Sequence, residues 1–194
     1  DMEYNDLDCA LEAILRQTSA LLERDGRAFL AIDGRCASGK TTLAGQLAQR
    51  LPCTLVHMDD FFLQPQQRTP QRLAQPGGNV DRERFLSEVL SPLLAGRDAV
   101  YRPFDCHTFQ MRQPVTAPCR PVGLVEGSYS CHPDLWDRDG LHIFVTASLD
   151  TRLERLARRP GANLENFRTR WIPLEERYFE AFPIQQRCEV VVHT

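Results

Sequence analysis

Residues Gly34–Thr41 read Gly-Arg-Cys-Ala-Ser-Gly-Lys-Thr, which fits the pattern G-x-x-x-x-G-K-[S/T] without a gap. A short apolar run at residues 27–33 precedes this segment and predicts a buried strand. After the segment, leucines recur every four residues from Leu43 to Leu51 and predict one face of a helix, which Pro52 ends. A strand, a glycine-rich loop and a helix in this order indicate a phosphate-binding P-loop.

The residue types in the loop suit the binding of a nucleoside triphosphate. Glycines allow backbone N–H groups to turn toward a phosphate chain, and the following helix adds the positive end of its dipole. Lys40 is the only lysine among 23 lysines and arginines, which indicates a position that needs a compact ammonium group. We expect Lys40 to reach the β- and γ-phosphates and the Thr41 hydroxyl to bind Mg²⁺. The candidate nucleotide-binding residues are Gly34, Ala37, Ser38, Gly39, Lys40, Thr41 and Thr42.

Composition excludes several other classes of protein. The 194 residues are 42% hydrophobic and 25% charged, with a formal net charge of −3, which argues against a nucleic-acid or membrane-surface partner. No apolar run approaches the roughly 18 residues of a membrane helix, and no signal-peptide pattern is visible, so a cytoplasmic location is expected. The seven scattered cysteines form no C-x-x-C pair, which favours reduced thiols over a zinc site.

The alternation of apolar strands and amphipathic helices predicts an α/β fold. We expect a three-layer α/β/α arrangement of the P-loop NTPase type, with a mostly five-stranded parallel sheet and a short helical lid. Residues 1–194 are expected to form one domain, with an N-terminal helix in 1–26, the α/β core in 27–194 and the lid at about 150–172. Strands are predicted at 27–33, 53–58, 99–102, 121–127, 141–146 and 189–192, and helices at 7–22, 42–51, 81–94, 150–159 and 173–182. The polar stretch at 64–78 is predicted to be an irregular loop.

Two acidic residues follow predicted strands. Asp59 comes after the second strand and Glu126 after the fourth, and ligands bind at the carboxyl ends of parallel strands. Phosphoryl transfer uses one carboxylate to accept the acceptor's hydroxyl proton and another to anchor a metal. The structural alternatives are a turn or N-cap for Asp59, a role that suits Asp60 better, and a solvated loop acid for Glu126.

The segment after the fifth strand is rich in arginine. Its arginines are Arg152, Arg155, Arg158, Arg159, Arg168 and Arg170. Such a run is often a solvated helical face paired with nearby glutamates. The functional alternative is a mobile lid whose guanidinium groups close on the transferring phosphoryl group and exclude water.

Other P-loop classes fit the sequence poorly. The guanine-reading N-K-x-D sequence is absent, and so is an L-S-G-G-Q stretch, which disfavours GTPases and transporter ATPases. A chain of this length also leaves no room for the additional domains of a motor protein.

Four segments together resemble the uridine kinase branch of the P-loop kinases, which also includes phosphoribulokinase and pantothenate kinase. They are Gly34–Thr41, Met58–Phe62, Tyr101–His107 and Val125–Gly127, and the resemblance extends over about residues 27–192. It implies ATP and Mg²⁺ as cofactors and transfer of the γ-phosphate to a hydroxyl of a small, nucleoside-like metabolite. It also implies that Asp59 is the base and that Glu126, with Thr41, is linked to the metal.

The resemblance further implies a set of substrate contacts. Asp81 corresponds to an aspartate that holds ribose hydroxyls, and Tyr101 and His107 correspond to residues that contact the nucleobase. Arg155 and Arg158 of the lid are candidate catalytic residues, and Arg168 is a further candidate substrate contact. The stretch from Tyr101 to His107 is one residue longer than in the family, and the lid differs from the family pattern at two positions, Leu156 and Arg159.

Two other functions stay open. The first is a kinase of another metabolite, such as a vitamin precursor, a sugar or a sugar phosphate, for which Arg68 and Arg72 would favour an anionic acceptor. The second is a nucleotide-binding module without transfer activity, although such a module has no need of two carboxylates at strand ends. The expected partner is a small-molecule substrate, with no nucleic acid or membrane, and a homo-oligomer is open.

Overall fold

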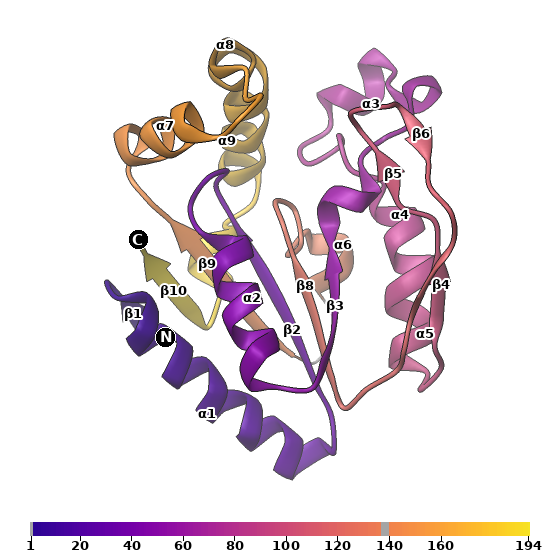
Figure 1. Cartoon of the computed structure of the whole chain (residues 1–194), viewed down its shortest axis with the longest axis vertical. Coiled ribbons are helices and arrows are strands. Elements are labelled where there is room, and N and C mark those ends of the chain that lie inside the picture. The colour runs from indigo at the N-terminus through magenta and orange to yellow at the C-terminus, as the bar shows by residue number, and fades with distance from the viewer. Residues whose placement is uncertain (1, 137–139) are drawn as a thin grey trace.

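The centre of the fold is a parallel sheet in the order β1-β10-β9-β2-β8-β3 (Figure 1). The computed structural model describes residues 2–136 and 140–194. The strands of the sheet are β1 (Met2–Tyr4), β2 (Ala28–Gly34), β3 (Cys53–His57), β8 (Val122–Glu126), β9 (Leu141–Thr146) and β10 (Val190–His193). The five strands from β10 to β3 confirm the predicted parallel core. The sixth, β1, is a short and mostly exposed edge strand, so it has no apolar run that the sequence could reveal.

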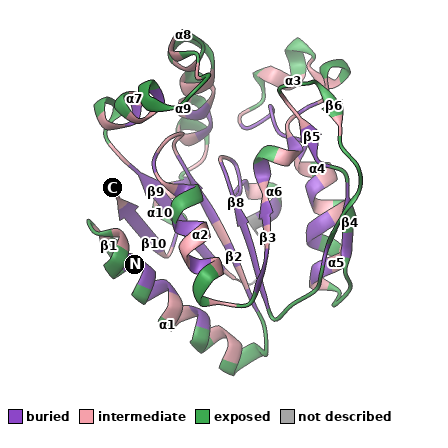
Figure 2. Ribbon diagram, viewed as in Figure 1, coloured by how far each residue is buried: buried purple, intermediate pink, exposed green. Residues whose placement is uncertain are grey.

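Successive side chains of the strands point to opposite faces of the sheet, and both faces are apolar. On β9, Ile143 and Val145 pack toward α1 (Leu7–Asp25) and α2 (Lys40–Arg50). The side chain between them, Phe144, packs on the other face. Figure 2 shows the central strands largely buried and the outer surface of α1 exposed. A sheet that is buried on both faces is typical of parallel α/β proteins.

The second face carries a further group of helices. A continuous helical segment runs through α4 (Arg82–Phe85), η3 (Leu86–Leu90) and α5 (Ser91–Leu94). Its apolar side chains join those of α6 (Pro133–Trp136), α9 (Ile172–Ala181) and α10 (Ile184–Arg187) in one core cluster. The predicted three-layer α/β/α arrangement is therefore confirmed.

Two helical segments contain a wider turn directly before a proline. The turn η3 precedes Pro92, and η4 (Phe167–Trp171) precedes Pro173, which lies in the first turn of α9. A proline donates no backbone hydrogen bond, and its ring crowds the carbonyl four residues earlier, so a widened turn accommodates it inside a continuous helix. The helix predicted to begin at Pro173 therefore begins earlier, at α8 (Leu164–Asn166).

The chain between the second and fourth predicted strands forms a separate flank of the molecule. Here β4 (Ala99–Tyr101) pairs antiparallel with β7 (Val115–Ala117), and β5 (Phe104–Asp105) pairs with β6 (Gln110–Met111). The strand predicted at 99–102 therefore exists but lies outside the central sheet. The stretch predicted to be irregular contains two short helices, η2 (Pro65–Gln67) and α3 (Pro70–Ala74). Opposite this flank lie α7 (Leu149–Arg158) and α8 (Figure 1).

Across the described ranges, 2–136 and 140–194, no helix combines the length and the apolar character that crossing a membrane requires.

Candidate active site

The P-loop connects β2 to α2, and three of its residues have a positive φ. Gly34 and Gly39 have φ values of 141° and 111°, and Ala37 has a φ of 56°. A side chain at Gly34 would collide with the carbonyl oxygen of Val145 in β9, so only glycine fits there. Gly39 is the last residue before α2, and the helix therefore starts at Lys40, two residues earlier than predicted.

Lys40 folds back over the loop. Its Nζ donates hydrogen bonds to the carbonyl oxygens of Gly34, at 3.0 Å, and Arg35, at 2.7 Å. The side chain is almost buried, and the ammonium lies above the loop where a phosphate chain would bind.

Thr41 and Glu126 lie together beside Lys40. The Thr41 hydroxyl is 3.4 Å from each oxygen of the Glu126 carboxylate, and His57 Nδ1 is 2.6 Å from Glu126 Oε1. Glu126 is buried rather than solvated, and the next residue, Gly127, approaches Met58 so closely that a Cβ would lie 2.9 Å from its Cβ. The bond to Glu126 raises the pKa of His57, against the effect of burial. A hydroxyl and a carboxylate are hard oxygen donors of the kind that Mg²⁺ prefers, so these two residues fit the predicted metal role.

The two adjacent acids after β3 differ in where they point. Both belong to η1 (Met58–Phe61). Asp59 lines the main cleft, which is the large cavity beside the P-loop, and Asp60 does not line it. Asp59 is open to solvent within the cleft and closely surrounded by protein on its other sides. That enclosure, followed by the charge of Glu126, raises the pKa of Asp59, while the Lys40 charge lowers it. A raised pKa suits a carboxylate that accepts a proton from a hydroxyl.

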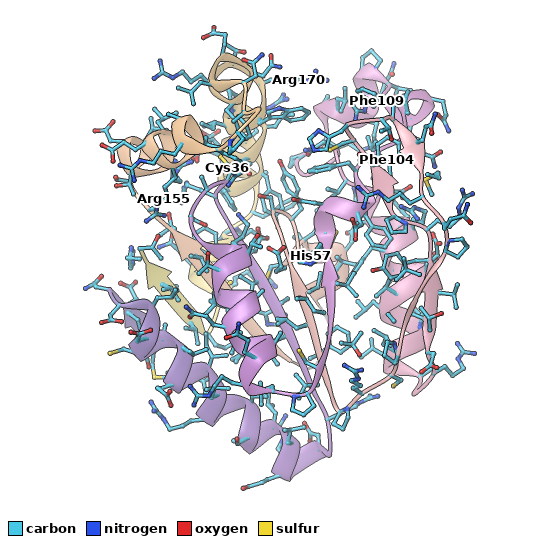
Figure 3. All side chains as sticks on the ribbon, in the orientation of Figure 1. Cys36, His57, Phe104, Phe109, Arg155 and Arg170 are labelled. Atoms are coloured by element: carbon cyan, nitrogen blue, oxygen red, sulfur yellow. The ribbon has the colours of Figure 1, made fainter. Side chains whose placement is uncertain are left out.

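The cleft itself has a volume of about 1000 Å³. It is bounded by the P-loop, the loop after β8, the β5–β6 hairpin and the lid segment from Arg155 to Trp171. In Figure 3, Phe109 of the hairpin and Arg170 of the lid lie on opposite sides of this opening. Of the predicted site residues, the lining includes Ala37, Ser38, Gly39, Lys40, Thr41, Thr42, Asp59, His107, Glu126 and Arg155.

Other predicted substrate contacts have structural roles. Asp81 caps α4 by accepting a hydrogen bond from the backbone N–H of Arg84, at 3.1 Å, and it also accepts one from Gln67. The ring of Tyr101 is buried against Phe61, with the ring centroids 5.3 Å apart. As far as the described residues define it, neither side chain lines the cleft; Asn79, two residues before Asp81, does.

The lid arginines separate into four groups. Arg155 donates hydrogen bonds to the carbonyl oxygens of Ala37, at 3.1 Å, and Ser38, at 3.2 Å, and so contacts the P-loop directly. Arg152 is buried and bonds to the carbonyl of Ala147, which is a structural role. Arg158 and Arg168 are exposed outside the cleft lining, whereas Arg159 and Arg170 line it.

Sequence reasoning missed a buried carboxylate beneath the P-loop. Asp33 Oδ1 accepts hydrogen bonds from the backbone N–H groups of Gly34, at 2.7 Å, and Tyr129, at 3.0 Å. Its Oδ2 accepts from the Cys131 N–H, at 3.0 Å, and the Tyr178 hydroxyl, at 2.8 Å. Asp33 thereby joins the P-loop, the loop after β8 and α9. The sequence signal that could have identified Asp33 is a charged residue at the end of an apolar strand.

A second missed carboxylate belongs to α9. Glu175 is buried and accepts hydrogen bonds from the backbone N–H of Cys36, at 2.9 Å, and the Ser128 hydroxyl, at 2.7 Å. Its neighbour Glu176 pairs with Arg35 at 2.7 Å. These contacts fix the start of α9 to the P-loop, and no local sequence pattern marks them.

The comparisons with known proteins bear on the fold. No family model matches the chain, and no curated protein matches it. Among solved structures, a possible uridine kinase from Bacillus stearothermophilus has a TM-score of 0.71 and 22% identity, covering 96% of this chain and 98% of the other. A candidate fructose transport system kinase from Silicibacter sp. TM1040 has a TM-score of 0.60 and 22% identity, covering 92% and 98%.

A third similar structure comes from yeast. YFH7 from Saccharomyces cerevisiae, a candidate P-loop kinase with a circular permutation, has a TM-score of 0.67 and 14% identity, covering 97% of this chain and 98% of the other. The three matches extend over nearly the whole of both chains, and the chain therefore has the fold of the P-loop kinases.

Proposed function

We propose that this protein is a kinase that transfers the γ-phosphate of ATP, with Mg²⁺, to a hydroxyl group of a small metabolite. One observation carries the proposal: the P-loop residues Lys40 and Thr41 share a cleft with two carboxylates, Asp59 and Glu126, from the ends of neighbouring strands. A module that only binds nucleotide needs the P-loop but has no use for a second free carboxylate with a raised pKa.

The residues divide the work of phosphoryl transfer between them. The P-loop N–H groups and Lys40 hold the phosphates and orient the γ-phosphate toward Asp59. Asp59 accepts the proton of the acceptor hydroxyl as that oxygen attacks. Thr41 and Glu126 are positioned to hold Mg²⁺, which when bound neutralises charge on the β- and γ-phosphates. Arg155, already bonded to the P-loop, stabilises the negative charge of the transferring group.

The test is coupled ADP release with ATP and Mg²⁺ against a panel of hydroxyl acceptors. The panel includes uridine, cytidine and fructose, which the resemblance and the similar structures suggest, together with pantothenate and pentose and hexose phosphates. The proposal expects at least one acceptor to stimulate ADP release. Tight ATP binding with no stimulation by any acceptor would favour the nucleotide-binding module instead.

The residues expected to contact a nucleoside fit the cleft less well than the residues expected to take part in catalysis. Two of the three residues expected to contact a nucleoside, Asp81 and Tyr101, are engaged in capping and core packing. Only His107 lines the cleft. The acceptor is therefore better sought from the chemistry of the cleft itself.

A further inference from the structure

A smaller chamber opens beside the main cleft. It has a volume of about 280 Å³ and lies between the α3 region and the segment from η4 to α9. Its lining shares Phe62, Arg68, Asn79, Arg170 and Trp171 with the main cleft, so the two spaces adjoin. Phe62 lines both spaces and follows Asp59 by three residues, so the chamber adjoins the part of the cleft that holds the proposed base.

Three arginines converge on this chamber from two sides of the molecule. Arg68 comes from the loop before α3, Arg170 from η4 and Arg177 from α9. Burial lowers the pKa of Arg68, and the positive charge of Arg170 nearby lowers it further.

These three guanidinium groups have no acidic partner among the described residues. Arg68 bonds to the Leu63 carbonyl and stacks on Phe109, and Arg170 lies 4.8 Å from the Trp171 ring centroid. Several arginines elsewhere pair with carboxylates, among them Arg35, Arg72, Arg82, Arg84 and Arg112, whereas others, such as Arg102, Arg120 and Arg155, bond to carbonyl oxygens. Arg72, which the sequence suggested beside Arg68, is held by Glu83 and by two carbonyls and is not available to a ligand. A concentration of unpaired positive charge in a partly apolar cavity favours an anionic ligand.

We propose that the chamber bound by Arg68, Arg170 and Arg177 holds an anionic group, a carboxylate or a phosphate, of the phosphate acceptor. This inference rests on the proposed kinase function and specifies its substrate class. The acceptor hydroxyl lies at Asp59, the carbon skeleton passes Phe62 and Asn79, and the anionic end reaches the three arginines. Apolar side chains such as Trp171 and Leu174 line the rest of the chamber and contact carbon atoms of the acceptor.

A substitution of Arg177 tests the chamber separately from the ATP site, because Arg177 lines the chamber but not the main cleft, where ATP binds. We expect Arg177→Gln to lower kcat/KM for an anionic acceptor by roughly 10- to 100-fold, mainly through KM, because it loses a charge-assisted contact. The KM for ATP should not change. The matched control is Arg97→Gln, at an exposed turn far from the cleft, which should behave as the wild type.

The experiment compares acceptors in pairs that differ in charge: pantothenate with panthenol, glycerate with glycerol, and fructose 6-phosphate with fructose. Uridine is included as a neutral nucleoside. The inference expects the anionic member of the productive pair to be preferred by at least about tenfold, with the preference lost in Arg177→Gln. The identity of that pair distinguishes a carboxylate from a phosphate.

Phosphorylation of uridine or another neutral acceptor as efficiently as the anionic compounds would overturn the inference and leave the kinase intact. A change in the KM for ATP, and not for the acceptor, in Arg177→Gln would also overturn it.

If no compound of the panel stimulates ADP release, the result counts against the kinase proposal. The chamber is then tested by its binding of inorganic phosphate. Inorganic phosphate is titrated with the P-loop filled by ADP, and the tryptophan fluorescence of the protein, to which Trp171 contributes, is followed. A change that Arg97→Gln retains and Arg177→Gln loses supports the anion site. No change in the wild type overturns it.

Discussion

The ammonium group of Lys40 donates a hydrogen bond of 2.7 Å to the carbonyl oxygen of Arg35, within the loop that Lys40 itself ends. With a second bond to Gly34, this contact satisfies a nearly buried positive charge by carbonyl groups alone. Carbonyl oxygens carry only partial charge, so a bound phosphate is a stronger partner for the ammonium. The loop therefore holds its one lysine in place for an anion.

Replacing that lysine should greatly reduce activity and leave the fold intact. We expect Lys40→Met to reduce kcat/KM by roughly 100- to 1000-fold, because the transferring phosphate loses a preorganised positive charge. The free energy of unfolding should change by only about 1 kcal/mol, since the lost contacts are two hydrogen bonds to carbonyls at the cleft. Steady-state kinetics and denaturant unfolding measure the two effects. A large loss of stability would assign Lys40 a structural role.

The pairing of Thr41 with Glu126 predicts a change in metal dependence. Glu126→Gln keeps an acceptor for His57 but removes the negative charge beside the Thr41 hydroxyl. We expect the Mg²⁺ concentration for half-maximal activity to rise by about 10- to 100-fold, as is typical when the ligands around a metal site are altered. A titration of activity against Mg²⁺ at saturating ATP tests this. An unchanged Mg²⁺ requirement would remove Glu126 from the metal site.

The buried carboxylate of Asp33 predicts a large effect on stability. Asp33→Asn replaces one acceptor oxygen by an NH₂ group, which would face hydrogen-bond donors. We expect a loss of about 2 to 4 kcal/mol in the free energy of unfolding. Tyr178→Phe removes only one donor and should cost about 1 kcal/mol in comparison. Equal effects of the two substitutions would show that Asp33 does not act as the common anchor.

His132 predicts how stability depends on pH. Its ring is buried between Tyr178 and Phe182, and burial lowers its pKa to about 4 from an ordinary value of 6.5. Between these pH values the unfolded chain binds a proton that the folded protein does not, so stability falls as the pH is lowered from 6.5 to 4. Over this range His132 alone should account for about 2 to 3 kcal/mol.

The variant His132→Phe isolates this effect. It keeps an aromatic ring at the position and should reduce the slope of unfolding free energy against pH by the equivalent of one proton. Denaturant unfolding at several pH values from 4 to 7.5 measures the slope. Parallel curves for the variant and the wild type would contradict the assignment.

The sequence predicted the features that depend on local patterns. The strand–loop–helix order around Lys40, the five apolar strands and the amphipathic helices all follow from periodicity and from glycine, and the structure confirms them. Asp59 and Glu126 could be found because residues at the ends of parallel strands gather at one edge of the sheet. Their roles in catalysis stay predictions.

What the sequence could not predict depends on contacts between distant segments. Glu175 meets the P-loop 139 positions away, and Asp33 meets Tyr178 across 145 positions. Asp81 was expected at the substrate because of a short motif, but the same carboxylate caps a helix in the structure. Arg170 and Arg177 are two helical turns apart, but no spacing rule connects them to Arg68, which comes from a distant loop.

The most direct test of phosphoryl transfer concerns Asp59. The rate at which Asp59→Asn transfers the γ-phosphate to the best acceptor is measured together with its equilibrium binding of ATP. The matched control is Asp60→Asn, because Asp60 is adjacent but does not line the cleft. We predict that Asp59→Asn binds ATP normally while kcat falls by roughly 100- to 10,000-fold, and that Asp60→Asn retains most of the activity. Near-normal turnover by Asp59→Asn would contradict it.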